Sequence, residues 1–233
     1  MVLGLDIRQD RMEILRKVGY LPSEANFYHG MRVRDVLKLS ADLRKMDCTA
    51  RAEELCQRLE LDPTRKVEEL SFGNRKKVGI VCALQADPEL LILDEPTGGL
   101  DPLMQKEFFD ILRERNRQGT TVFLSSHVLS EVQHNCDYAA IIRDGDIITC
   151  DRMEKLAKAN ARKVTLRGQV DLRGLSGVRN VQEENGLVSF LYSGEMGQLL
   201  QVLAAGKVTD LSVAEPDLEE MFLHYYGKDG GKA

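Results

Sequence analysis

The sequence predicts an α/β protein in which helices cover a parallel sheet, followed by a smaller α+β unit. The apolar run Leu90–Leu93 leads into Asp94 and Glu95 and is closed by Pro96, which is typical of a buried parallel strand. A second strand-like run, 120–124, follows after one helix-length segment, so strands and helices alternate here. Beyond residue 161 the composition becomes strand-like again, which predicts the second unit.

The composition describes a chain that can bury a core and that is not built to bind nucleic acid. Its 233 residues are 43% apolar and its formal net charge is −5, whereas nucleic-acid-binding proteins usually present a basic face. Five scattered cysteines without a Cys-x-x-Cys pair predict reduced thiols rather than disulfides or zinc. No apolar run approaches the ~18 to 20 residues that cross a bilayer. Nothing resembles a signal peptide, so we expect contact with a membrane only through a partner.

The amino-terminal region predicts short strands and three helices. Pro22 ends the second strand, and Thr49 is a plausible N-cap for the third helix. The expected elements are a strand at 2–3, a helix at about 10–17, a strand at 18–21, and helices at 33–45 and 49–59.

Two strong helix starts flank the central strand. Leu70-Ser71-Phe72-Gly73-Asn74 opens a helix that runs to about Gln85. Asp101, as N-cap, and Pro102 open another that ends near Gly119. Further on, 138–149 predicts a hairpin with an Asp-Gly turn.

These elements suggest four segments. Residues 1–150 form the first domain, with a helical subdomain at about 28–86. A linker at 151–161 leads to a small α+β domain at 162–226, whose last helix starts near Pro216, and a disordered tail at 227–233.

Asp94 and Glu95 are the first candidates for a functional site, because open α/β sheets bind ligands at the carboxyl ends of their strands. A core strand with an acidic end would account for a single Asp. The longer pattern Leu-Ile-Leu-Asp-Glu-Pro-Thr, with Gly99-Leu100-Asp101 after it, resembles the Walker B segment and D-loop of ATP-binding-cassette (ABC) ATPases. The resemblance implies that Asp94 is the magnesium-side ligand and that Glu95 activates water. It also implies that Asp101 communicates between two ATP-binding subunits.

Further segments carry the resemblance. Ser71, Phe72, Gly73 and Asn74 match the family's signature loop, commonly Leu-Ser-Gly-Gly-Gln, with departures at Phe72 and Asn74. A Ser hydroxyl and the N–H groups of a helix start form an anion site; in the family this site binds the γ-phosphate of ATP on the opposite subunit. His127 follows a buried strand and matches the family's switch His, which contacts the γ-phosphate.

Gly19-Tyr20-Leu21-Pro22-Ser23 resembles the family's Q-loop, with Ser23 where Gln is usual. A Ser side chain is too short to contact magnesium as the Gln does. The resemblance assigns 28–43 to coupling with a membrane partner. Glu215-Pro216 also fits the accessory domain of ABC-2 type exporter ATPases.

The family's phosphate loop, Gly-x-x-x-x-Gly-Lys-Ser/Thr, does not occur in the sequence, since the Gly-Lys pairs at Gly206, Gly227 and Gly231 are not followed by Ser or Thr. In the family its N–H groups and Lys hold the β- and γ-phosphates. We expect the reading frame upstream of Met1 to encode this loop, a genuinely short subunit being the other possibility. We expect the 233 residues alone to bind ATP poorly.

The resemblance as a whole implies an ATP-hydrolysing subunit of an ABC exporter. Its cofactors would be ATP and Mg²⁺, and its partners a transmembrane permease and a second ATP-binding subunit. It would be cytoplasmic and peripheral on the inner face of the cell membrane. Two alternatives stay open: a non-hydrolysing subunit that donates its signature face to a partner, and a soluble ABC protein of translation or repair.

Overall fold

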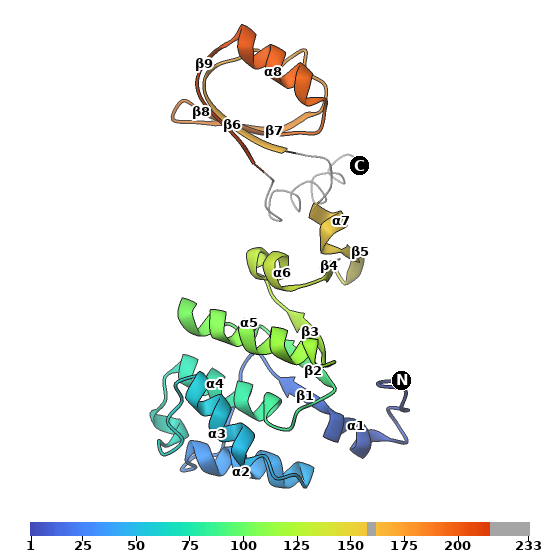
Figure 1. Cartoon of the computed structure of the whole chain (residues 1–233), viewed down its shortest axis with the longest axis vertical. Helices are drawn as coiled ribbons and strands as arrows, with labels where there is room; N and C mark the ends of the chain where they lie inside the picture. The colour runs from blue at the N-terminus through green and yellow to red at the C-terminus, as the bar shows by residue number, and fades with distance from the viewer. Residues whose placement is uncertain (158–161, 215–233) are drawn as a thin grey trace. The chain divides into compact units, whose positions relative to one another are not determined.

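The computed structural model describes residues 1–157 and 162–214, and the chain divides into two compact units, Met1–His127 and Val128–Ala233 (Figure 1). The sequence suggested a boundary at about 150 instead, and the domain organisation stays a prediction. The helix expected from Pro216 and the tail at 227–233 lie outside the described residues.

A three-stranded parallel sheet organises the first unit. The strands β1 (Val18–Leu21), β2 (Leu90–Asp94) and β3 (Thr121–Ser125) lie in that order, with Leu21 beside Leu93 and Asp94 beside Ser125. All three strands therefore end at the same edge, as the apolar run ending in Asp94 predicts.

The helices of this unit form most of its core. Val33, Leu55, Ile80, Leu91 and Phe108 are representative core side chains, each completely buried. The helical elements are α1 (Arg11–Lys17), α2 (Val33–Arg44), α3 (Thr49–Arg58), the 3₁₀ turn η1 (Val67–Glu69), α4 (Phe72–Leu84) and α5 (Pro102–Arg117).

Helix α4 packs closely on β1 because each element has a glycine where it meets the other, Gly19 on β1 and Gly79 on α4. A Cβ atom on Gly19 would overlap the carbonyl oxygen of Ala83, and one on Gly79 would lie 2.7 Å from a methyl carbon of Leu21. Real Cβ atoms do not approach that closely. The two glycines therefore fix how near α4 comes to β1.

Three expectations for this unit need correction. Val2 and Leu3 form no strand: Val2 makes an isolated bridge to Leu5 around a tight turn. Thr49 is the first helical residue of α3 and Cys48 is at the cap position, while the Thr49 hydroxyl donates to Asp47 at 2.7 Å.

The third correction concerns burial of the sheet. Strand β2 was expected to be buried on both faces, but only Leu91 and Leu93, on one face, are buried. On the other face Tyr20, Ile92 and Phe123 lie side by side in register, and Tyr20 and Phe123 are more than half exposed.

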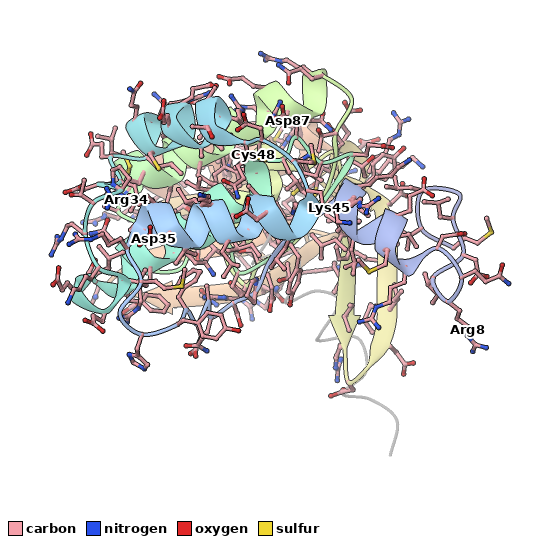
Figure 2. All side chains as sticks on the ribbon, turned by 90° about the horizontal axis from the view of Figure 1, so that it is seen from below. Arg8, Arg34, Asp35, Lys45, Cys48 and Asp87 are labelled. Carbon is pink, nitrogen blue, oxygen red and sulfur yellow. The ribbon has the colours of Figure 1, made fainter. Side chains whose placement is uncertain are left out.

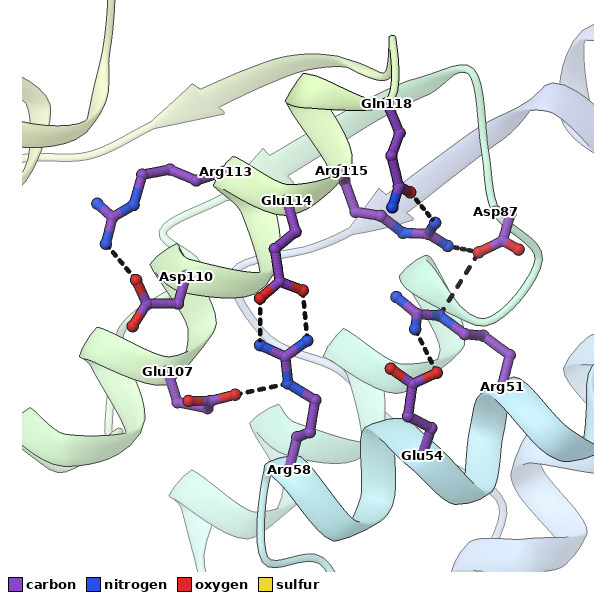
Figure 3. Close-up of polar contacts among 10 residues, drawn as sticks. All are labelled: Arg51, Glu54, Arg58, Asp87, Glu107, Asp110, Arg113, Glu114, Arg115 and Gln118. Carbon is purple, nitrogen blue, oxygen red and sulfur yellow. Dashed lines mark hydrogen bonds and ion pairs between the residues drawn. The ribbon is translucent and has the colours of Figure 1, made fainter.

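A network of ion pairs joins α3 to α5 and to the loop before β2 (Figure 3). Arg58 of α3 contacts Glu114 with two nitrogens, at 2.5 and 3.0 Å, and Glu107 at 2.6 Å. Asp87 lies between Arg51 of α3 and Arg115 of α5 and pairs with both. The helical region is thus tied to the helix that follows β2.

The second unit contains a hairpin and an antiparallel sheet. The hairpin joins β4 (Tyr138–Arg143) to β5 (Asp146–Arg152), and Asp144 and Gly145 turn with positive φ, as the Asp-Gly pair predicted. Helix α6 (Leu129–Asn135) precedes it, and α7 (Met153–Ala157) occupies part of the expected linker.

The antiparallel sheet has the strand order β7-β8-β6-β9 and its own core against α8. Val164, Phe190 and Leu199 are almost fully buried in that core. Its elements are β6 (Arg162–Gln169), β7 (Val178–Glu184), β8 (Leu187–Tyr192), α8 (Met196–Ala205) and β9 (Lys207–Ala214).

Candidate functional site

The carboxyl edge of the parallel sheet brings a carboxylate and a hydroxyl together. Asp94 ends β2 and Ser125 ends β3, in register with each other. The Ser125 hydroxyl donates to Asp94 Oδ1 at 2.6 Å and accepts from the backbone N–H of Glu95 at 3.2 Å. One Asp94 oxygen is thus oriented by a neighbouring strand.

Glu95 lies next to Asp94 but contacts a different residue. Its backbone has φ of +45°, a left-handed conformation that is strained for a residue with a side chain. Its Oε2 is 2.7 Å from Nδ1 of His127, two residues beyond the end of β3. The Glu95 side chain is 33% exposed and that of His127 is 81% exposed, so water and a ligand can reach the pair.

This arrangement gives the two neighbouring carboxylates different chemistry. A carboxylate that contacts an imidazole and is open to water can accept a proton from that water. Asp94, held by Ser125, offers an oxygen ligand of the type that Mg²⁺ prefers. Mg²⁺ is commonly bound by one or two carboxylates together with substrate phosphates. The residues therefore fit that ion, although the described residues contain no group of three or more acidic, His or Cys side chains placed to hold a metal.

The start of α4 lies against the turn that follows β2. Ser71 is the N-cap, and its hydroxyl accepts from the N–H of Asn74 at 3.3 Å. A Cβ atom on Gly73 would overlap the carbonyl oxygen of Gly99, and one on Gly99 would overlap the ring of Phe72. The two motifs that the sequence singled out are therefore in contact within one chain.

Asp101 and Ser23 occupy separate positions. The Asp101 carboxylate caps α5, accepting from the N–H groups of Leu103 at 3.1 Å and Met104 at 3.0 Å, as its sequence context predicts. Ser23 is exposed in the loop after β1, and its carbonyl oxygen accepts from Lys76 Nζ at 2.8 Å.

Sequence analysis did not identify Ser125 and Lys76 as site residues. Ser125 could have been found, because it directly precedes the Ser126-His127 pair at the end of a predicted strand. Lys76 could have been suspected as a cation between the apolar positions of α4. Neither signal identifies the residue that Ser125 or Lys76 contacts, because that residue lies on another strand or loop.

Two cavities lined by described residues lie away from the carboxylates. A groove of about 1280 Å³ runs between α2 and α3 and has an apolar lining that includes Leu37, Ala52 and Cys56. Figure 2 shows Arg34 and Asp35 near one end of α2 and Lys45 near the other. A smaller pocket of about 370 Å³ lies between the loop 23–29 and the start of α4.

Comparison with known proteins gives the family. The family model described as ABC transporter matches residues 2–98. The Daunorubicin resistance ATP-binding protein DrrA3 of Streptomyces coeruleorubidus is 31% identical over 98% of this chain and 78% of its own length. This chain is an ABC transporter ATP-binding protein. YhaQ of Bacillus subtilis (strain 168), an ABC transporter ATP-binding protein, is 30% identical over 92% of this chain and 76% of its own length. The Bacitracin transport ATP-binding protein BcrA of Bacillus licheniformis is 28% identical over 97% and 78%.

Solved structures agree with the fold of this ABC protein. The ATP-binding subunit of an ABC transporter superposes with a TM-score of 0.62 at 25% identity, covering 66% of this chain and 67% of that one. The dimeric bacterial ABC transporter cassette MJ0796 gives a TM-score of 0.54 at 21% identity, covering 65% and 69%. The expected α/β fold and ABC family are thus confirmed. In the part of the chain that the structure describes, every helix is too short or too polar to cross a bilayer.

Proposed function

We propose that Glu95 is the general base of ATP hydrolysis in this ABC subunit and that His127 contacts the γ-phosphate. The observation that carries this proposal is the 2.7 Å contact between Glu95 and His127 at the edge where the parallel strands end. Glu95 would accept the proton of the attacking water, and His127 would orient that water beside the phosphate. The strained backbone of Glu95 supports a functional role for its fixed position.

Asp94 would hold Mg²⁺ through the carboxylate that Ser125 orients. A bound Mg²⁺ supplies positive charge that neutralises the phosphates as the terminal bond breaks. The residues of this chain would position the acid oxygens and leave the remaining coordination sites to water and ATP. Ser23, whose side chain is short, would act through its loop rather than as a ligand.

Ser71, Phe72, Gly73 and Asn74 would contact ATP bound to a second subunit, with Asp101 near the same interface. The open start of α4 supports this role, since Phe72 is about half exposed and Ser71 is exposed. A helix N-terminus with a Ser hydroxyl favours an anion. We infer that two ATP-binding subunits, identical or different, enclose the nucleotide.

A transmembrane permease would be the second partner, and its docking region would be 28–43, which includes most of α2. Exposed apolar side chains near the end of α2 support this inference: Leu43 is 73% exposed, and Met46, which lines the groove between α2 and α3, is 43% exposed. The names of BcrA and DrrA3 refer to bacitracin transport and daunorubicin resistance, which favours an exporter. The subunit would then lie on the cytoplasmic face of the membrane, attached through the permease.

Turnover by a fusion protein tests this proposal. A phosphate-loop segment from a related cassette is placed before residue 1, because the sequence itself has no such motif. We expect Mg²⁺-dependent ATP hydrolysis that EDTA abolishes. Asp94→Asn should lower it by roughly 100-fold or more, because a charged ligand is lost. The exposed hairpin carboxylate provides a matched control, Asp144→Asn, which should keep the parent rate. A folded fusion that binds ATP without hydrolysing it would favour the non-hydrolysing subunit instead.

A further inference from the structure

Lys76 is a buried cation on α4 that reaches two separate segments of the sheet edge. Its side chain is almost fully enclosed, with the residue only 3% exposed. Nζ lies 2.8 Å from the carbonyl oxygen of Ser23, 3.3 Å from that of Pro22 and 3.4 Å from that of Asp94. Three N–H donors of one ammonium group therefore have three carbonyl acceptors.

The acceptors belong to parts of the chain far apart in sequence. Pro22 and Ser23 begin the loop after β1, whereas Asp94 is the last residue of β2. Burying an ammonium group is costly unless it is paired and hydrogen-bonded. Burial lowers the pKa of Lys76, while the negative charges of Asp94 and Glu95 act in the opposite direction. The carbonyl oxygens and the two carboxylates together offset the cost of burial.

We propose that Lys76 is a positioning residue that holds the Ser23 loop against the end of β2. Residues 22–29 of this loop form no regular secondary structure, and residues 23–29 line the smaller pocket. By joining Ser23 to the backbone of Asp94, Lys76 sets the distance between this loop and the two carboxylates. The consequence for ATP hydrolysis rests on the proposed function, but the tether itself does not.

The loop leads into α2, so Lys76 lies between the carboxyl edge of the parallel sheet and the helical region. Removing its ammonium group should free the loop while leaving α4 and the sheet packed. It should also remove a positive charge behind two adjacent carboxylates. Lys76→Met keeps the length and apolar stem of the side chain but has no donor.

Limited chymotrypsin digestion of the full 233-residue chain, without nucleotide, tests the tether. The sites to follow are Phe27 and Tyr28, in the loop that Lys76 holds, with initial cuts mapped by mass spectrometry. Cleavage reports the population of the open loop when opening is fast. Because hydrogen bonds to a charged group are lost, Lys76→Met should speed cleavage there roughly tenfold or more. Cleavage at sites in the second unit should keep the parent rate.

Two variants separate tethering from packing. Lys77→Met removes a neighbouring cation that is also buried, at 7% exposure, and no bond from it to residues 22–23 is seen in the described part of the chain. It should leave the loop resistant. Lys76→Arg keeps the charge and several donors and should recover most of the resistance.

Three results would overturn the proposal. These are a parent cleavage rate in Lys76→Met, an equal increase in Lys77→Met, or faster cleavage at all sites in proportion. A fusion protein that fails to hydrolyse ATP would contradict the proposed function and leave these digestion results unchanged.

Discussion

Asp94 and Glu95 are adjacent in sequence, yet their side chains contact different residues. Ser125 binds the first and His127 the second, and both come from the end of the neighbouring strand. The left-handed backbone at Glu95 turns the chain just after β2 ends. The two adjacent carboxylates can therefore serve different roles, because each one contacts its own polar side chain.

Ser125 provides the first prediction at this scale. Ser125→Ala removes the hydroxyl that orients Asp94 and accepts from the N–H of Glu95. Residues that orient a metal ligand commonly contribute 10- to 100-fold, so we expect the fusion protein to lose about tenfold in ATP turnover. Thr121→Ala, at the exposed other end of β3, is the control and should not change the rate. Equal rates for the parent and Ser125→Ala would show that this hydrogen bond has no catalytic role.

Sequence analysis could predict only part of this site. Asp94, Glu95 and His127 lie at or just after the ends of strands that short apolar runs in the sequence predict. Their position at one edge of the parallel sheet could therefore be predicted without the structure. The partners Ser125 and Lys76 could not be assigned, because they depend on strand register and on how closely α4 packs on β1. That packing depends on Gly19 and Gly79, whose role appears only once both elements are in place.

At the scale of elements, charged side chains link α3 to α5 in the first unit. Arg58 joins α3 to α5 with three hydrogen bonds, and its guanidinium group lowers the pKa of Glu114 from the usual 4.5. A carboxylate with a lowered pKa contributes stability that is present above the unfolded value and lost as the pH falls through the folded value.

Arg58→Met should therefore destabilise the first unit in a pH-dependent way. We expect the free energy of unfolding to fall by about 1–2 kcal/mol at pH 7, because charge-assisted hydrogen bonds are lost. The difference from the parent should shrink as the pH drops below 4.5 and through the lowered pKa of Glu114 in the folded chain, because protonation removes the charge that pairs with Arg58. Urea denaturation followed by circular dichroism at several pH values measures both effects.

A surface arginine of α2 gives the matched control. Arg34 is exposed and pairs only loosely with its neighbour Asp35, at 3.8 Å, so Arg34→Met should change stability by less than about 0.5 kcal/mol. A pH-independent loss in Arg58→Met would show that apolar packing of the Arg58 stem, rather than its pairing with Glu114, supports the contact.

The elements themselves were predictable where their signals are local. The helix starts of α4, within 70–74, and of α5, with Asp101 as its cap, were predicted, because side chains that bind the N–H groups of the next turn mark such starts locally. The expected strand at Val2-Leu3 was wrong, since two residues without a partner strand form only a bridge. The full burial expected for β2 was also wrong, because burial of a strand's second face depends on what packs there.

At the scale of the whole molecule, each compact unit has its own core. The first contains the parallel sheet and every residue predicted for the nucleotide site, and the second contains the hairpin and the α8-covered sheet. The family assignment covers nearly the whole chain, since DrrA3 aligns over 98% of it. The proposed catalytic chemistry therefore belongs to the first unit.

The most direct test of the account is ATP hydrolysis by the fusion protein with Glu95→Gln. Gln keeps the size of Glu and can hold a water, but it cannot accept the proton. Hydrolysis should therefore fall by ~10²-fold or more while ATP binding persists.

The unhydrolysed nucleotide should then hold two subunits together, as an ATP-dependent dimer on size-exclusion chromatography. Ser71→Arg in the same protein should abolish that dimer, because a bulky side chain would enter the opposing phosphate site. If Glu95→Gln hydrolyses ATP at the parent rate, Glu95 is not the base, and the central claim is contradicted.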